Sequence, residues 1–241
     1  MSSLNSVLPS NACAEIIEGK DKVHNVVILM HGLGDSHKSF ANMAKNVPLP
    51  NTSYISLRGP YRLPLDFENP GGNWMWGEDV HFDQNGELQS EADFSKSFTM
   101  ISNLIGNLLS YGILSSRIFF FGFGQGAMVA LYSCYKLSTK YQLGGIFSFG
   151  GTLPLSITLP NHPFHVPVYL FEKRLHCSCS EYEESRLRKT FKPFHLTCWN
   201  RDDKTDMPSS PREWYTFVQS ISKHLYIHNT LFEDAIPLTS F

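Results

Sequence analysis

Apolar runs alternate along the chain with stretches in which apolar residues recur every three or four positions. A short uninterrupted apolar run predicts a strand that is buried on both faces of a parallel sheet. Strands are predicted over residues 26–30, 52–57, 117–121, 145–149, 166–171 and 194–199. Helices are predicted over residues 91–112, 125–140, 181–191 and 211–225. This alternation predicts an α/β fold with a mostly parallel central sheet and helices on both faces.

Two local signals sharpen these boundaries. Ser210, Pro211 and Glu213 form a capping box with proline at the first helical position, which predicts the start of the last helix. Residues 60–90 are rich in Pro, Gly, Asn and Trp and predict a long surface loop that shapes or covers a site. Its aromatic segment, residues 73–77, is either a hydrophobic lid or ordinary packing, and we favour packing. We find no repeat or linker, and therefore expect one domain over residues 1–241.

Composition excludes several classes of function. The chain has 241 residues, 42% of them hydrophobic and 17% charged, with a formal net charge of −2. Without a basic block, nucleic acid and anionic membranes are not expected as main partners. The apolar run at 26–30 is too short to span a bilayer, and the N-terminus lacks the pattern of a signal peptide, so we expect a cytoplasmic protein. We expect no cofactor.

The chain contains five cysteines, Cys13, Cys134, Cys177, Cys179 and Cys198. An odd number at irregular spacing does not indicate a disulfide framework. His176 lies beside the pair Cys177 and Cys179, but a zinc site needs four ligands, and no second pair is present. We therefore expect reduced thiols and no bound metal.

The segment FFFGFGQGAMVAL, residues 119–131, carries the most informative pattern. A buried strand, a glycine-dense turn and an apolar helix make the frame of a nucleophile elbow, G-x-S-x-G, which displays a serine above an α/β sheet. Gly124 occupies the central position where that serine belongs. Glycine adopts the strained backbone of an elbow at little cost, so the substitution is expected to be tolerated.

Two motifs together resemble one family. HGLGD at residues 31–35 and GFGQG at residues 122–126, with the order of elements over about residues 22–226, are similar to the acyl-protein thioesterase, lysophospholipase and carboxylesterase family of α/β-hydrolases. The resemblance implies the α/β-hydrolase fold. It also implies a catalytic serine at the elbow, an aspartate after the next-to-last strand and a histidine before the last helix.

Carried over position by position, the resemblance places all three catalytic positions on other residues. The serine position falls on Gly124, the aspartate position on His176 and the histidine position on Lys204. Acyl transfer by this route needs a hydroxyl nucleophile, an imidazole base and a carboxylate that orients the base. We therefore expect no functional catalytic residue at this triad.

Other residues could restore the chemistry. Asp202, Asp203 and Asp206 could supply the acid, but His224 and His228 lie in or beyond the last helix. Ser36, which follows HGLGD, has no evident base. The expected roles of the other polar candidates are structural; these are His31 in the HGLGD turn, and Cys134, Tyr132 and Tyr135 in the helix after the elbow.

The resemblance also implies that the oxyanion donors remain, as the backbone amides of Leu33 and Gln125. With His176 and Lys204 beside a helix start, the pocket is predicted to hold a fatty-acyl or other small anionic ligand. The alternative is that Asp202, Asp203 and Asp206 neutralise Lys204 at the surface and leave no site.

Three functions remain open at this point. The first is an acyl-protein thioesterase- or carboxylesterase-like protein that has lost serine-hydrolase activity and binds an acyl ligand or a partner. The second is an active carboxylesterase or palmitoyl-protein thioesterase with a non-standard nucleophile. The third is a structural or partner-binding domain with a filled pocket.

Overall fold

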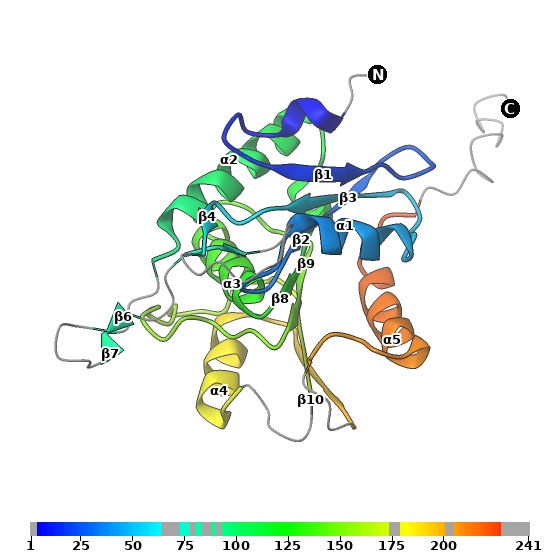
Figure 1. Ribbon diagram of the computed structural model, residues 1–241. Coiled ribbons are helices and arrows are strands. Elements are labelled where there is room, and N and C mark those ends of the chain that lie inside the picture. Colours follow the sequence, from blue (N-terminus) through cyan, green and yellow to red (C-terminus); the bar gives the residue numbers. More distant parts are fainter. Residues whose placement is uncertain are drawn as a thin grey trace, which may run out of the picture.

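A seven-stranded sheet forms the centre of the molecule (Figure 1). The computed structural model describes residues 4–63, 73–77, 81–82, 88–89, 93–173, 179–200 and 205–227. The strands run in the order β1-β3-β2-β8-β9-β10-β11, and every neighbouring pair is parallel except β1 and β3. Their bounds are β1 Ala14–Ile17, β2 Asn25–Met30, β3 Thr52–Leu57, β8 Ile118–Phe123, β9 Gly145–Phe149, β10 Val168–Lys173 and β11 Phe194–Trp199.

Helices cover both faces of the sheet, as the alternating pattern predicts (Figure 1). They are α1 His37–Lys45, α2 Ser95–Tyr111, α3 Gln125–Leu137, α4 Glu181–Thr190 and α5 Pro211–Ser222, with short 3₁₀ turns η1 Leu4–Val7 and η2 Ser115–Arg117. The remaining strands form two separate pairs, β4 Tyr61–Arg62 with β5 Trp74–Met75 and β6 His81–Phe82 with β7 Leu88–Gln89. Among the described residues, no helix is both long and apolar enough to cross a bilayer.

Two hydrophobic clusters fill the space on the two faces. Successive side chains of a strand point to opposite faces, so Val26 and Ile28 of β2 join the cluster beneath α2, α3 and α4, and Val27 joins the one beneath α1 and α5. Phe120 and Phe121 of β8 divide in the same way. Because both faces of β2 and β8 are buried, these strands read as continuous apolar runs in the sequence.

Most predicted elements are confirmed, with shifted ends. The capping box at Ser210 is present, and α2 ends at Gly112, whose φ of 105° is left-handed. The structure begins α2 at Ser95 rather than Glu91, and it ends α3 at Leu137 rather than near residue 140. In addition, β8 extends through Phe123 rather than ending at residue 121. Gly122, which the pattern assigned to the turn, pairs with Ser148 of β9.

The aromatic segment 73–77 packs inside the molecule, as we favoured. Trp76 is fully buried, its indole Nε1 donates to the carbonyl oxygen of His31 over 2.8 Å, and Ser97 donates its hydroxyl proton to the carbonyl oxygen of Trp76. Asn73 bonds through its backbone N–H to Gly34 O. The segment therefore anchors the HGLGD turn.

Candidate functional site

Gly124 stands between β8 and α3 in the conformation of a nucleophile elbow. Its φ is 50° and its ψ is −119°, a backbone region that residues with a side chain adopt only under strain. The Gly124 N–H donates to Phe149 O over 2.9 Å, and its carbonyl oxygen accepts from Met128 N–H over 3.1 Å. Both hydrogen bonds fix the turn against β9 on one side and α3 on the other.

The glycines on either side of Gly124 are required by close backbone approach. A Cβ at Gly126 would lie 2.6 Å from the carbonyl carbon of Met30, and a Cβ at Gly122 would lie 2.5 Å from Cα of Ala127. Neither position has room for a side chain. The glycine-dense pattern therefore reflects the packing of α3 against β2 and β8.

Position 124 itself is open. A Cβ built on Gly124 would meet no described atom within 4 Å apart from its two chain neighbours. A side chain here would thus project into free space above the sheet, although glycine supplies none. The elbow has the backbone and the space for a nucleophile, and no nucleophilic atom.

His31 holds the HGLGD turn, as predicted. The N–H of Gly59 donates to His31 Nε2 over 3.0 Å, so the ring proton lies on Nδ1, which donates to Gly32 O over 2.7 Å. Burial lowers the pKa of His31 to about 4. The imidazole is therefore neutral, and both of its nitrogens are used in the turn.

The two backbone amides predicted as oxyanion donors belong to Leu33, in the HGLGD turn, and to Gln125, at the start of α3. Gln125 is the first residue of α3, so its backbone N–H has no partner within the helix. In the described part of the chain, the Leu33 N–H donates to no other backbone group. The Gln125 side chain accepts from Trp76 N–H over 2.8 Å and donates to Gly77 O over 2.9 Å. That the two amides act together as oxyanion donors stays a prediction.

The positions predicted for the acid and the base, His176 and Lys204, lie outside the described residues. Of the adjoining residues that the structure describes, two carry buried carboxyl groups. Glu172, near the end of β10, is 1% exposed, and Asp206, just before α5, is 7% exposed. The sequence analysis assigned no role to Glu172.

Asp206, which the alternative interpretation places at the surface beside Lys204, is buried. Its Oδ1 accepts from Lys173 N–H over 2.9 Å, and its carbonyl oxygen accepts from Trp199 Nε1 over 2.8 Å. A Cβ at Gly150 would lie 2.9 Å from Cγ of Asp206. Asp206 therefore joins the ends of β9, β10 and β11. Asp202 and Asp203 lie outside the described residues.

Glu172 is a buried carboxyl group with an incompletely satisfied side chain. Its Oε1 has no hydrogen-bond partner. Burial, together with the nearby Asp206 carboxylate, raises the pKa of Glu172 to about 7, against a backbone hydrogen bond from Cys179 that lowers it. A charged residue at the end of the apolar run at 166–171 is the sequence signal that could have drawn attention to it.

The alternative nucleophiles are placed in structural positions. Ser36 is 3% exposed and precedes α1. Cys134 is fully buried, and burial raises the pKa of its thiol to about 12, so it is a thiol at neutral pH. Tyr132 packs edge-on against Phe94, and Tyr135 donates its hydroxyl proton to Thr158 O. The expected packing roles of these three side chains are confirmed.

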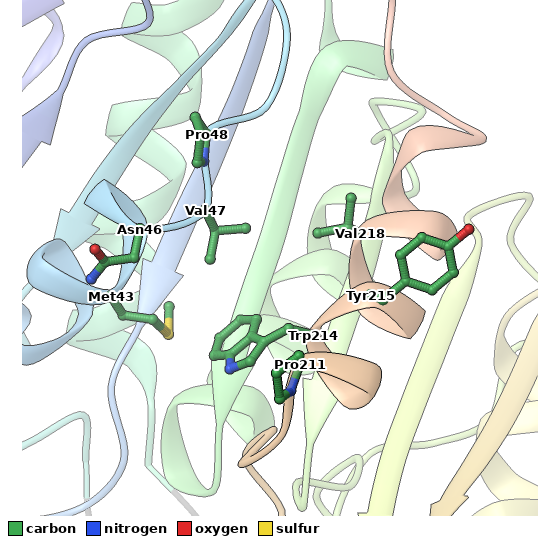
Figure 2. A pocket seen from close by; sticks show the side chains of 8 residues that line it. All are labelled: Met43, Asn46, Val47, Pro48, Pro211, Trp214, Tyr215 and Val218. Atoms are coloured by element: carbon green, nitrogen blue, oxygen red, sulfur yellow. The ribbon is translucent and has the colours of Figure 1, made fainter.

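A hollow of about 490 Å³ lies between α1 and α5, on the face of the sheet opposite α3 (Figure 2). Met43 and Val47 face Trp214 and Val218 across it. The Trp214 ring stacks on the Phe121 ring, with the two ring centroids 6.5 Å apart. Both rings belong to the cluster beneath α1 and α5, on the face of the sheet opposite α3. The hollow is therefore separate from the elbow.

No group of three or more potential metal ligands occurs among the residues that the structure describes. In that part of the chain, no disulfide joins Cys13, Cys134, Cys179 and Cys198. His176 and Cys177 lie outside it, so the structure does not test the clip considered from the sequence.

Two hydrolases of fungi match large parts of the chain. An uncharacterised hydrolase of Mycosarcoma maydis is 28% identical over 205 residues, which cover 83% of this chain and 76% of that protein. Acyl-protein thioesterase 1 of Schizosaccharomyces pombe is 32% identical over 136 residues, which cover 56% of this chain and 59% of the thioesterase.

Solved structures show the same fold. The structure of Zea mays acyl-protein thioesterase 2 superposes with a TM-score of 0.65 at 19% identity, over 89% of this chain and 99% of that one. The carboxylesterase of Bacillus cereus gives 0.63 at 16% identity, over 90% of this chain and 96% of that one. The fold is thus the α/β-hydrolase fold. Residues 11–229 match the phospholipase/carboxylesterase family, and the chain belongs to that family.

Proposed function

We propose that this member of the family has lost the serine-hydrolase step and acts as a pseudo-hydrolase that binds an acyl ligand. The observation that carries the proposal is Gly124, a residue without a side chain in a fully formed elbow. The serine mechanism begins with attack by a hydroxyl oxygen on the acyl carbon. Hydrogen at this position cannot form the acyl-enzyme bond, whatever base lies nearby.

The buried environment near the elbow further supports the proposal. Gly150 and Gly151 lie between Gly124 and Asp206, since a Cβ at Gly151 would be 2.7 Å from Gly124 O and Asp206 packs on Gly150. The described residues thus place a carboxyl group, and not an imidazole, against this turn. A carboxyl group bonded to the Lys173 amide is held for structure rather than for proton transfer to an elbow nucleophile.

A hydrolysis assay tests the loss of activity. The purified full chain is incubated with p-nitrophenyl acetate and with an octanoyl thioester, with an active acyl-protein thioesterase as positive control. We expect rates equal to those of heat-denatured protein. Turnover above that background, blocked by a fluorophosphonate, would instead support the active enzyme with a non-standard nucleophile.

An apolar rim supports acyl-ligand binding. Leu33 follows β2 and is 53% exposed, and Leu155 follows β9 and is 61% exposed. Loops after parallel strands meet at the carboxyl edge of the sheet, where ligands of open α/β folds bind. Exposed leucines on both sides of the open elbow are suited to contact a hydrocarbon chain.

Calorimetry with a matched pair of variants tests this binding. Leu33→Ser should weaken the binding of oleate about 10-fold, because it removes most of one leucine's apolar contact. Leu114→Ser is the control, since Leu114 is 66% exposed but precedes η2 at the opposite edge of the sheet. Equal affinities for both variants and the unmodified chain would remove the acyl site from the elbow.

A role of His176 and Lys204 in holding an anionic head group remains part of the proposal. Titrating the unmodified chain and Lys204→Ala with oleate and with inorganic phosphate separates this role from hydrocarbon contact. A cation that binds the head group should make both affinities fall in the variant. Unchanged affinities would show that Lys204 takes no part.

A further inference from the structure

Cys13 and His37 form a thiol–imidazole pair outside the elbow. Cys13 Sγ lies 3.8 Å from His37 Nε2. Cys13 immediately precedes β1, where its carbonyl oxygen accepts from Arg58 N–H over 2.9 Å, and His37 is the first residue of α1. Two separate elements therefore bring the side chains together, at the same sheet edge as the elbow but three strands away.

His37 is held firmly in this position. Its backbone carbonyl oxygen accepts from Ser56 Oγ over 2.6 Å, and the residue is 9% exposed. The second ring nitrogen, Nδ1, has no hydrogen-bond partner. The ring therefore has one described polar contact, to the sulfur of Cys13.

The charge around His37 favours the neutral imidazole. Burial lowers the pKa of His37 most, and the Arg58 guanidinium and Lys38 lower it further, against Glu15, which raises it. Arg58 is itself fixed, since its guanidinium carbon stands 3.7 Å above the ring of Trp74. A neutral imidazole at physiological pH can accept a proton, which a base for a thiol requires.

Cys13 also differs from other cysteines in the described part of the chain. Cys134 is buried, whereas Cys13 is a partly exposed residue. Cys198 is exposed on the edge strand β11. The sulfur of Cys13, in addition, contacts an imidazole.

We propose that Cys13 and His37 form a reactive pair at which the Cys13 thiol undergoes disulfide exchange with small-molecule disulfides. The thiol proton moves to His37 Nε2, and Sγ attacks one sulfur of the disulfide. The bond between the two sulfurs of the disulfide breaks as the new bond to Sγ forms. The departing thiolate takes the proton from His37 and leaves as a thiol, so Cys13 is oxidised to a mixed disulfide while half of the reagent is reduced.

Exchange at sulfur fits this site better than attack on a carbonyl. Displacement at a disulfide needs a thiolate and access along one direction, whereas acyl transfer also needs amide donors for an oxyanion. The recorded contacts of Cys13 are the His37 ring and the Arg58 backbone amide, which is already bonded to the Cys13 carbonyl oxygen. The pair is independent of Gly124, so its failure would leave the proposed function untouched.

Site-resolved mass spectrometry of the full chain with excess hydroxyethyl disulfide at pH 7 tests the proposal. We expect Cys13 to form the mixed disulfide faster than Cys198, although Cys198 is the more exposed thiol. His37→Asn should slow the reaction of Cys13 about 10-fold, since a positioned base supplies at least this factor, and leave Cys198 unchanged. Lys38→Ala is the control next to His37 and should change neither rate by more than about twofold.

Two results would overturn the proposal. One is a Cys13 rate at or below that of Cys198 in the unmodified chain, a comparison that needs no variant and no assumption about folding. The other is an unchanged Cys13 rate in a His37→Asn protein whose circular dichroism matches that of the unmodified chain. Either result would show that the imidazole does not activate the thiol.

Discussion

The elbow around Gly124 and the described ends of β10 and β11 lie at the same edge of the sheet, yet they are held in different ways. The elbow is held by backbone: Gly124 N–H bonds to Phe149 O, and Gly122 and Gly126 allow α3 to approach the sheet. The strand ends are held by side chains, since the Asp206 carboxylate accepts from Lys173 N–H and packs on Gly150, and Glu172 near the end of β10 is buried.

This difference separates what the fold needs from what the chemistry needs. The backbone of the elbow must keep its shape because α3 packs through it, whether or not a nucleophile is present. The acid and base of a hydrolase, by contrast, are side chains. When the reaction no longer needs them, the residues at these positions can form other contacts. An intact glycine frame is therefore evidence for the family, and not for its reaction.

The largest effect is expected from filling one of the close approaches in the elbow. Gly126→Ala should lower the free energy of unfolding by about 3 kcal/mol, because its Cβ would overlap the backbone of Met30. Gly124→Ala is the matched control and should lose only about 1 kcal/mol, from backbone strain alone. Urea denaturation measures both. Equal losses would mean that α3 does not pack as closely as the glycines indicate.

Glu172→Gln should change how stability depends on pH. The raised pKa means that the folded protein keeps this proton between pH 4.5 and about 7, where the unfolded chain has released it. Stability of the unmodified chain therefore falls as the pH rises through that window. Above it, the variant should be more stable than the unmodified chain by about 2 kcal/mol, and near pH 4.5 the difference should be small.

Urea denaturation at pH 5 and pH 8 checks this prediction. Glu18→Gln, at an exposed position, serves as the control and should leave the pH dependence unchanged. If Glu172→Gln kept the full pH dependence of the unmodified chain, the buried carboxyl group would be ionised at both pH values, and the strand ends would not be held as described.

The smallest effect is expected from returning the hydroxyl to the elbow. Gly124→Ser should fit without overlap and should lower the free energy of unfolding by about 1 kcal/mol, since a serine at φ near +50° is strained. Its ester hydrolysis should remain at background because a serine without its base loses most of its advantage. A competent esterase from this single change would mean that a working base is already in place.

The elbow could be predicted from the sequence because the backbones of α3 and the sheet approach so closely that only glycine fits at positions 122 and 126. The glycine spacing in the sequence therefore reveals the turn. Strands β3, β9 and β11 were predicted with their observed bounds because turn residues mark their limits. Helix α1 was missed because it has only nine residues. The buried positions Phe40, Ala41 and Ala44 are too few to establish a helical period. Strand β1 was missed because its four residues are half-buried at the sheet edge.

The contacts of Glu172, Asp206 and Cys13 could not be predicted from the sequence. Each depends on which loops meet at the sheet edge, and loop positions follow from tertiary packing rather than from periodicity. Asp206 illustrates this: a run of four charged residues at 201–204 nearby suggests a solvated turn, but the Asp206 side chain accepts from the backbone N–H of Lys173 in β10. Cys13 and His37 are 24 positions apart and meet only because β1 pairs with β3 beside α1.

Fluorophosphonate labelling of the purified full chain tests the central claim most directly. The reagent reacts with an activated serine in hydrolases of this class, and intact-mass spectrometry counts the adducts. The absence of a nucleophile at Gly124 predicts an unchanged mass under conditions that fully label an active acyl-protein thioesterase. A stoichiometric adduct that peptide mapping places on one residue would contradict the claim and identify the nucleophile of an active enzyme.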